Sequence, residues 1–395
     1  MQFKDKYNFK NLLEFVSFFN SNEKCREYLS YSRWNGKPQC PRCNYNEKMY
    51  FLKTKNIYKC PKCYKQFSVT QGTIFHGSNV PLTKWFFAMY EFTNNVRGIS
   101  SVQLAKRIGV EQKTAWLMLQ KIRKSLSQDE ELLTGIVEVD EAYCGPKINR
   151  DKRLAAKVYK HKEMRIKMEA EGVQEKRRRK KRDQKDRENL WDIYSKLQYE
   201  CRSLLSDKED RMRWYQPFHY KKNIVGAIER NIKDSFGNVI KKGKLRLTKM
   251  GRHGGDICEE NMIPYLTKTI SPDSHLITDK AMVYYNMNTY FREHSTITHS
   301  TKGTPSKNVR YVNGYKTTNS IENIWNQFKK MENTTFVHFS WKYTNYYLNE
   351  FVFRYNYGRG SSSEIFHSLL KKTVNILITR KDVFLTPDDY TYQAK

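Results

Sequence analysis

Two Cys-x-x-Cys pairs constrain the fold of this chain more than any other feature. Cys40-Pro-Arg-Cys43 and Cys60-Pro-Lys-Cys63 are separated by sixteen residues. Four thiolates at this spacing can close tetrahedrally around one Zn²⁺, with each pair in a tight turn and the intervening segment in a hairpin. The spacing therefore predicts a zinc ribbon over residues 36–78, with these four cysteines binding a structural Zn²⁺.

Two other uses of the cysteines fit less well. Disulfide bonds are disfavoured because the pairs are regularly spaced and no secretory signal precedes them. Thioredoxin-like redox chemistry needs one such pair at a strand-to-helix junction, whereas each pair here contains Pro and a basic residue. The other cysteines are unpaired in sequence, which suggests a reducing compartment; they are Cys25, Cys144, Cys201 and Cys258.

The charge balance indicates the class of partner. The chain has 72 Lys and Arg against 41 Asp and Glu, a formal net charge of +31 over 395 residues. Such a surface attracts a polyanion through counterion release, so nucleic acid is the expected partner. No run of eighteen apolar residues occurs, so no membrane span is expected. The length allows two or three domains.

The first part of the chain has helical periodicity around the cysteines. Residues 1–35 predict a helical lead-in that packs on the ribbon through an apolar face, formed by Phe9, Leu12, Leu13, Phe15, Val16 and Phe19. Within the ribbon, alternation around Phe51 and Ile57 predicts a hairpin, and Phe67 a closing strand.

Residues 79–128 predict three helices and a DNA-binding helix-turn-helix. The first helix runs from Pro81 to Gly98, the second from Ser100 or Ser101 to Gly109, and the third from about Glu111 to Leu126. The third would be the recognition helix, and the side chains expected to face DNA are Gln112, Lys113, Gln120 and Arg123. An ordinary helical domain with solvated basic residues is the alternative, and the neighbouring ribbon and the charge favour DNA binding.

Three acidic residues further along the chain occur in a meaningful order. Asp140 ends a β-type run in which Glu138 shares its face, and Asp279 ends a second run. Glu322 lies on a helix whose apolar stripe is Ile321, Trp325 and Phe328, and Lys329 shares the face of Glu322.

Carboxylates at the ends of apolar strands are costly to bury unless a cation or hydrogen bonds compensate. If Asp140, Asp279 and Glu322 converged, they would bind hard divalent cations through oxygen. Two Mg²⁺ ions at short separation are a general device for in-line phosphoryl transfer. This order therefore predicts phosphodiester chemistry on DNA.

These residues resemble the DDE transposases of bacterial insertion sequences, in the zinc-ribbon group (ISXO-type) that is related to the eukaryotic Merlin elements. The matching segments are Arg33 to Cys43, Phe67 to Phe75, Val137 to Tyr143, Asp279, and Thr318 to Trp325 with Lys329.

The resemblance implies a multidomain α/β protein whose RNase H-like catalytic domain, residues 129–395, has a mixed sheet. It implies that Asp140, Asp279 and Glu322 form a triad that binds Mg²⁺ or Mn²⁺. It also implies that Lys329 contacts DNA phosphate near the scissile bond, with a solvated helix face as the alternative for Lys329.

The segment from Glu350 to Asn356 resembles the closing helix of the family, whose Arg and Asn support the fold. Strands are expected around Val137, Val225, Leu245 and Ile277, covered by helices such as 341–357.

The chain departs from the family in two places. Cys144-Gly145-Pro146-Lys147 stands where members usually have a Gly pair. A basic insertion, residues 147–217, interrupts the catalytic domain and includes the cluster 176–182. We expect long helices or a partly disordered arm that grips phosphates; a solvated spacer is the alternative. The cluster could also act as a nuclear localisation signal in a eukaryotic host.

The predicted function is that of a DNA transposase. It would bind the terminal inverted repeats of its element, hydrolyse a phosphodiester at each end and transfer the 3′-hydroxyl to target DNA, in a homo-oligomeric synaptic complex. The expected location is the cytoplasm with the bacterial nucleoid, or the nucleus in a eukaryote. The alternatives are a DNA-binding regulator with a catalytically inactive RNase H-like domain, and a metal-dependent nuclease without strand transfer.

Overall fold

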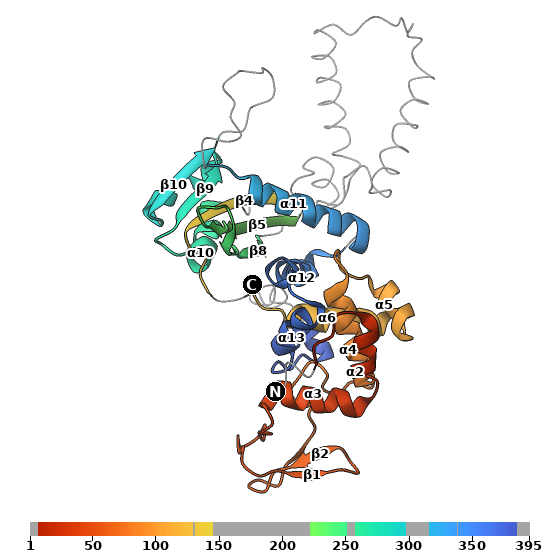
Figure 1. Cartoon of the computed structure of the whole chain (residues 1–395). Coiled ribbons are helices and arrows are strands. Elements are labelled where there is room, and N and C mark those ends of the chain that lie inside the picture. The colour runs from red at the N-terminus through yellow and green to blue at the C-terminus, as the bar shows by residue number, and fades with distance from the viewer. Residues whose placement is uncertain are drawn as a thin grey trace, which may run out of the picture. The chain divides into compact units, whose positions relative to one another are not determined.

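A computed structural model of the chain describes residues 7–128, 131–144, 222–250, 257–297, 316–337 and 339–384. The chain divides into two compact units, one of residues 1–140, 225–249 and 263–395, and one of residues 141–224 and 250–262. Most of the second unit, including the insertion predicted at 147–217, lies outside the described residues. The account below therefore concerns mainly the first unit (Figure 1).

The ribbon forms as the sequence predicts. Strands β1 (Tyr50–Leu52), β2 (Ile57–Lys59) and β3 (Gln66–Phe67) make an antiparallel sheet in the order β1-β2-β3. Phe67 is buried beside the cysteines, and the ring of Trp34 packs edge-on against Tyr58 and Phe67. The predicted hairpin and closing strand are confirmed.

The lead-in packs differently from the prediction. It forms α2 (Leu12–Phe18) and α3 (Asn22–Trp34), and Phe9, Phe15 and Phe19 are buried in the helical core, with aromatic contacts to Phe366. The predicted packing on the ribbon is therefore wrong for most of this segment. A helix as short as α2 turns only one narrow stripe inward, so the other apolar side chains are exposed; they are Leu12, Leu13 and Val16.

Three helices follow at the predicted positions, α4 (Leu82–Asn94), α5 (Ser101–Ile108) and α6 (Gln112–Ser125). Gly109 ends α5 at φ +60°, a left-handed conformation that favours glycine. Val96 lies beyond the end of α4 and is 92% exposed. The C-terminal helices α13 (Ser362–Thr373) and α14 (Arg380–Phe384) pack on α6, and α13 packs on α4 as well.

The part of the chain that follows α6 contains a five-stranded sheet in the order β10-β9-β4-β5-β8 (Figure 1). The strands are β4 (Ile136–Cys144), β5 (Lys222–Glu229), β8 (Leu245–Lys249), β9 (His275–Asp279) and β10 (Glu293–Ile297). β10, β9 and β4 are parallel neighbours. Hydrogen bonds at both ends of the β5–β8 pair, Glu229 N to Lys244 O and Met250 N to Asn223 O, show that this pair is antiparallel. The sheet is thus mixed; the four expected strands are present, and β10 was not predicted.

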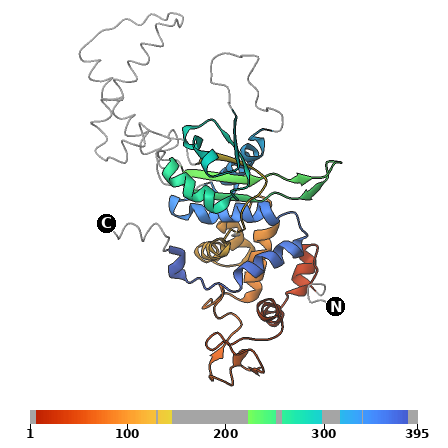
Figure 2. The same cartoon turned by 90° about the vertical axis from the view of Figure 1, so that its left-hand side faces the viewer.

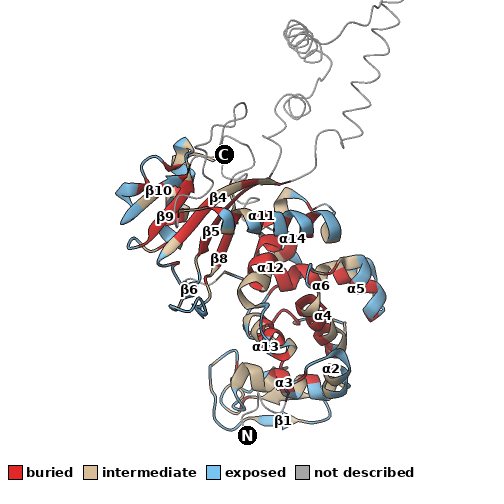
Figure 3. Cartoon of the chain, turned by 45° about the horizontal axis from the view of Figure 1, so that its top comes forward, coloured by how far each residue is buried: buried red, intermediate tan, exposed pale blue. Residues whose placement is uncertain are grey.

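Central strands of the sheet are buried (Figure 3), and helices pack on them. Helix α11 (Asn319–Met331) packs closely on β5, because a Cβ at Gly226 would lie 2.7 Å from the side chains of Leu247 and Trp325. Helix α10 (Glu259–Thr269) contains Pro264. The hairpin of β6 (Ile232–Lys233) and β7 (Val239–Lys241) projects from the sheet (Figure 2).

Helix α12 (Thr344–Tyr357) protects the edge strand β8 through side-chain amides. Asn356 accepts a hydrogen bond from Leu245 N (2.9 Å) and donates one to Leu245 O (3.2 Å), and Asn345 accepts one from Lys249 N (3.0 Å). These amides pair backbone groups that an edge strand otherwise leaves open. Short helical turns complete the chain: Met282–Tyr284, Met287–Thr289, Trp341–Tyr343 and the π-turn Glu332–Phe336.

Candidate metal and nucleic-acid sites

The four ribbon cysteines are brought together as the sequence predicts. Their sulfur atoms all lie within 4.8 Å of one another, and the Cys40–Cys63 and Cys43–Cys60 sulfur distances are both 3.6 Å. A tetrahedron with Zn–S bonds of about 2.3 Å has S–S edges of about 3.8 Å. The cluster therefore fits one Zn²⁺ with four thiolate ligands.

The two cysteine turns share one backbone design. Asn44 N donates to Cys40 O and Tyr64 N donates to Cys60 O, each at 2.9 Å. Asn44 and Tyr64 both have φ +56°, in the left-handed region. Matching turns of this kind point the two sulfurs of each pair inward, which explains why the spacing is so regular.

Ionisation of the cluster also suits a metal. Burial raises the pKa of the Cys40 thiol, but backbone N–H groups of Arg42 and Cys43 and hydrogen bonds from neighbouring thiols lower it to about 7. The backbone hydrogen bond at Tyr45 lowers the pKa of Cys43, while burial and hydrogen bonds with the other cysteines raise it to about 12. Four adjacent thiols cannot all ionise without a cation to share, so Zn²⁺ binding would release protons.

Asp140 and Asp279 lie on adjacent parallel strands. Ile136 of β4 pairs with His275 of β9, and Glu138 pairs with Ile277. The same register, continued by two residues, brings Asp140 level with Asp279. Side chains level with each other in a parallel pair point to the same face of the sheet, so the two carboxylates share one face.

Helix α11 adds the third carboxylate. The indole Nε1 of Trp325 donates to Oδ2 of Asp140 at 2.8 Å. Trp325 lies one helical turn after Glu322, whose Oε1 accepts from Thr318 Oγ1 at 3.1 Å. Oδ1 of Asp279 accepts from Ala281 N at 3.0 Å. Each carboxylate is thus oriented by a local donor.

The three carboxylates are not gathered as tightly as the cysteines. Within the described part of the chain, the four cysteines are the one group of three or more potential ligands whose atoms lie within 4.8 Å of one another. The triad consists of hard oxygen donors, which suits Mg²⁺ or Mn²⁺. The structure places its members on neighbouring elements, and cation binding would require their side chains to move closer together.

Glu138 is an important residue whose role the sequence did not reveal. Its carboxylate is fully buried and pairs with Arg230 Nε at 2.7 Å. It also accepts hydrogen bonds from Ser320 N (2.9 Å), Ser320 Oγ (2.9 Å) and Ile321 N (3.1 Å). Glu138 therefore holds the N-terminal turn of α11 on β4. Ile321, one of the residues bound by Glu138, directly precedes Glu322. The sequence contained one signal of this role, because Glu138 lies on the same strand face as Asp140.

Lys329 lies where the prediction requires, exposed on α11 and two turns after Glu322. Seven residues correspond to nearly two helical turns, so both side chains lie on one side of the helix. Its contact with DNA stays a prediction.

The N-terminal turn of α6 is accessible, as expected for a recognition helix. Gln112 and Lys113 are exposed, and Gln112 Nε2 donates to Ser101 Oγ of α5 at 2.7 Å. A hollow of about 530 Å³ lies beside this turn, lined also by Trp116, Arg380 and Phe384.

The prediction that Gln120 and Arg123 contact DNA is wrong. Both side chains are buried, and Arg123 Nε pairs with Glu350 Oε2 at 2.6 Å. The guanidinium of Arg123 also lies 4.3 Å from the ring centre of Tyr347. These residues lie on the face of α6 that packs on α12, so they stabilise the fold instead of contacting a ligand.

No helix among the described residues is long and apolar enough to cross a membrane.

Comparison with known protein families supports the resemblance. Residues 201–356 match the ISXO2-like transposase domain, and residues 20–66 match the transposase zinc-ribbon domain. The two matches together cover just over half of the chain. Both matched models describe domains of insertion-sequence transposases. The chain carries the ISXO2-like transposase domain and its zinc ribbon, which confirms the predicted resemblance. Asp279 and Glu322 lie within the matched domain, and Asp140 lies before it.

A relative from Halobacterium salinarum is described as an uncharacterized protein in transposable element ISH50. It is 30% identical over 131 residues, which are 32% of this chain and 44% of the relative. The chain thus spans less than half the length of that relative. No solved structure matches the chain.

Proposed function

We propose that this protein is a DDE-type DNA transposase that binds the ends of its element and carries out DNA cleavage and 3′-hydroxyl strand transfer. The transposase domain match supports the class. The observation that carries the proposal is the alignment of Asp140 and Asp279 on adjacent parallel strands, with Trp325 linking Asp140 to the helix that bears Glu322. Ligand sites in open α/β sheets form at the carboxyl ends of such strands.

The catalytic part would be an RNase H-like domain, as the resemblance implies, and the mixed five-stranded sheet supports this. Asp140, Asp279 and Glu322 would hold Mg²⁺ or Mn²⁺, which would activate the attacking water or 3′-hydroxyl and stabilise the leaving oxygen. Lys329 would contact a DNA phosphate near the scissile bond. Trp325 and Thr318 would keep Asp140 and Glu322 in orientation.

DNA recognition would come from the N-terminal part of the chain. The exposed first turn of α6, with Gln112 and Lys113, would enter the major groove, and the zinc ribbon would add contacts to the DNA backbone. The net charge of +31 supports a polyanionic partner. Two ends joined in one event require at least two active sites, so we expect a homo-oligomer on DNA. A protein of this kind would act in the cytoplasm on the nucleoid, or in the nucleus of a eukaryote.

A DNA-binding regulator with an inactive catalytic domain is the second candidate. It is favoured by one observation, that the three carboxylates do not lie within 4.8 Å of one another. A cleavage assay separates the candidates. Wild-type protein is incubated with a duplex carrying the terminal repeat, with Mg²⁺, with Mn²⁺ and with chelator. Asp279→Asn serves as the inactive control.

The transposase proposal expects cleavage that needs the metal, is lost in Asp279→Asn and leaves end binding unchanged. Tight end binding by wild-type protein without cleavage in either metal would favour the regulator.

A further inference from the structure

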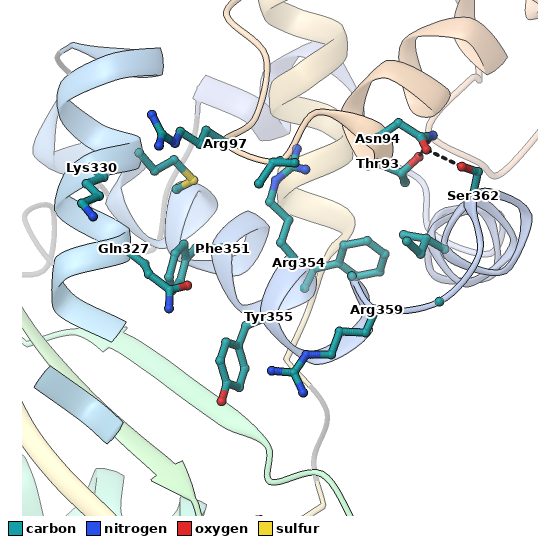
Figure 4. A pocket seen from close by; sticks show the side chains of 16 residues that line it. Thr93, Asn94, Arg97, Gln327, Lys330, Phe351, Arg354, Tyr355, Arg359 and Ser362 are labelled. Carbon is teal, nitrogen blue, oxygen red and sulfur yellow. Dashed lines mark hydrogen bonds between the residues drawn. The ribbon is translucent and has the colours of Figure 1, made fainter. Parts of the chain in front are cut away.

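A basic pocket lies beside the C-terminal half of α11 (Figure 4). It has a volume of about 670 Å³ and is lined by residues from the end of α4, from α11, from α12 and from the start of α13. Arg97 follows α4, and Gln327 and Lys330 come from α11. Tyr355 lies in the last turn of α12, and Arg359 follows that helix. These side chains have no role in the proposed cleavage and strand-transfer chemistry.

The charge of the pocket is one-sided. Four of its lining residues are cations, Arg97, Lys330, Arg354 and Arg359, and none is Asp or Glu. Arg354 already has partners, because it pairs with Glu350 at 2.7 Å and donates to Asn95 O at 2.6 Å. The other three cations are exposed, and no carboxylate of the described residues pairs with them. Three positive side chains are therefore available to a ligand.

Lys242 adds a further positive charge next to the pocket. Its Nζ donates to the backbone oxygen of Tyr355 and lies 4.6 Å from the centre of that ring. Burial lowers the pKa of Lys242, and the neighbouring charge of Arg359 lowers it further, to about 8. Lys242 and Arg359 are like charges that lie close together, and a bound anion would relieve their repulsion.

We propose that this pocket binds the sugar–phosphate backbone of DNA, a few nucleotides from the phosphate that reacts at the triad. The inference rests on the proposed function, because it assumes that DNA lies along α11. Eight residues separate Glu322 from Lys330, which is about 12 Å along a helix axis. One strand of B-DNA advances about 3.4 Å per phosphate, so the pocket would meet the third or fourth phosphate from the reacting one.

Such a contact would position the DNA without reading its sequence. Arg and Lys contacts to phosphate fix the register of a duplex on the protein, whereas base edges carry the sequence information. The pocket would therefore set which phosphodiester lies at the carboxylates. Its aromatic walls, Phe351 and Tyr355, give it a rigid frame for that task.

The test is the salt dependence of DNA binding by the full chain. The probe is a short duplex of random sequence, because phosphate contacts do not depend on sequence. The triple variant Arg97→Gln, Lys330→Gln, Arg359→Gln is compared with the control Lys24→Gln, Lys268→Gln, Lys371→Gln. The control residues are also exposed and do not line the pocket. Thermal unfolding verifies that both variants remain folded.

The proposal predicts that the slope of log affinity against log salt becomes shallower by about two to three in the pocket variant and changes less in the control. Equal slopes in wild type and pocket variant would overturn the pocket proposal while leaving the proposed function intact. A wild-type protein that binds no duplex would overturn both.

A second measurement tests the position. Single phosphates of a terminal-repeat duplex are replaced by neutral methylphosphonates. Replacement at the third or fourth phosphate from the cleaved bond should weaken binding of wild type and have little further effect in the pocket variant. An equal loss in both proteins at those positions would contradict this placement of the pocket.

Discussion

At the scale of single residues, Trp325 has a second role besides packing. It is a buried core residue of α11, and its indole N–H also donates to Asp140 at 2.8 Å. Groups that orient a metal-binding carboxylate typically affect metal affinity or activity by about 10–100-fold. Trp325 is thus a positioning residue in the proposed site, because it acts through Asp140.

We predict that Trp325→Phe, which removes the donor but keeps an aromatic ring, lowers the cleavage rate by about 10–100-fold. It should also shift the Mn²⁺ concentration needed for half-maximal cleavage upward, with end binding unchanged. The matched control is Phe328→Leu, which disturbs the same apolar stripe without touching a carboxylate. Equal losses in the two variants would show that Trp325 acts through packing alone.

Glu350 makes stability depend on acid pH. Its burial would raise the pKa, but the charges of Arg123 and Arg354 and their hydrogen bonds lower it below the ordinary value of 4.5. A lowered pKa in the folded state stabilises the protein above the unfolded pKa, and this contribution disappears as the pH falls through the folded pKa.

We therefore predict that the unfolding free energy of wild type decreases more steeply below about pH 4.5 than that of Glu350→Gln. At neutral pH the variant should lose about 3–5 kcal/mol, because Arg123 stays buried without its counter-charge. Urea unfolding over a pH series measures both effects. The exposed Glu260→Gln serves as the control, and a difference between Glu350→Gln and wild type that does not change with pH would contradict the account.

At the scale of elements, α11 is fixed by the strand it crosses. Glu138 on β4 accepts hydrogen bonds from the first turn of α11 and pairs with Arg230. This one buried carboxylate joins a strand and a helix that are more than 180 residues apart in sequence. The position of Glu322 therefore depends on Glu138.

We predict that Glu138→Ala lowers the unfolding free energy by about 3–5 kcal/mol, since it leaves Arg230 and the helix N-terminus without their acceptor. Cleavage should be lost even under conditions where the variant is folded, because Glu322 would no longer be held in place. Chemical denaturation and a cleavage assay below the melting temperature test the two parts. Full activity in the folded variant would rule out this positioning role.

The ribbon is the second element with a distinct prediction. Its core is small, with Cys40, Cys60 and Phe67 buried, so its fold should depend on Zn²⁺. A strong chelator or Cys43→Ser should unfold the ribbon and weaken end binding, while the melting transition of the rest of the chain is retained. Metal analysis should find one Zn²⁺ per chain in wild type. A fully cooperative, unchanged melting curve after zinc removal would contradict the prediction.

Most elements could be predicted from the sequence because their signals are local. Cysteine spacing defines the ribbon, and the periodicity of α4, α5, α6 and α11 follows from apolar stripes that the structure buries. The predictions that were wrong concern tertiary contacts. The burial of Arg123 depends on Glu350, which lies 227 residues away, and no local pattern indicates that pairing. Leu13 was assigned to the buried face of the lead-in but is exposed, because periodicity cannot indicate how narrow the buried stripe of a short helix is.

At the scale of the whole molecule, the candidate site joins residues from distant parts of the sequence. The acidic residues were selected by their order and their strand or helix context, and the register of β4 and β9 supports their alignment. The geometry of the three carboxylates would depend on the Mg²⁺ or Mn²⁺ that they bind. A sequence pattern does not describe a bound cation, so this geometry could not be predicted from the sequence. The two matched transposase domains agree with this organisation.

The most direct test of the central claim is a strand-transfer assay. Purified protein, labelled element ends and supercoiled target DNA are combined with Mg²⁺ or Mn²⁺, and joined products are measured for wild type and for Asp140→Asn. The account predicts joined products that need the metal and disappear in Asp140→Asn, while end binding is unchanged. Cut ends that are never joined, or joining that persists in Asp140→Asn, would contradict it.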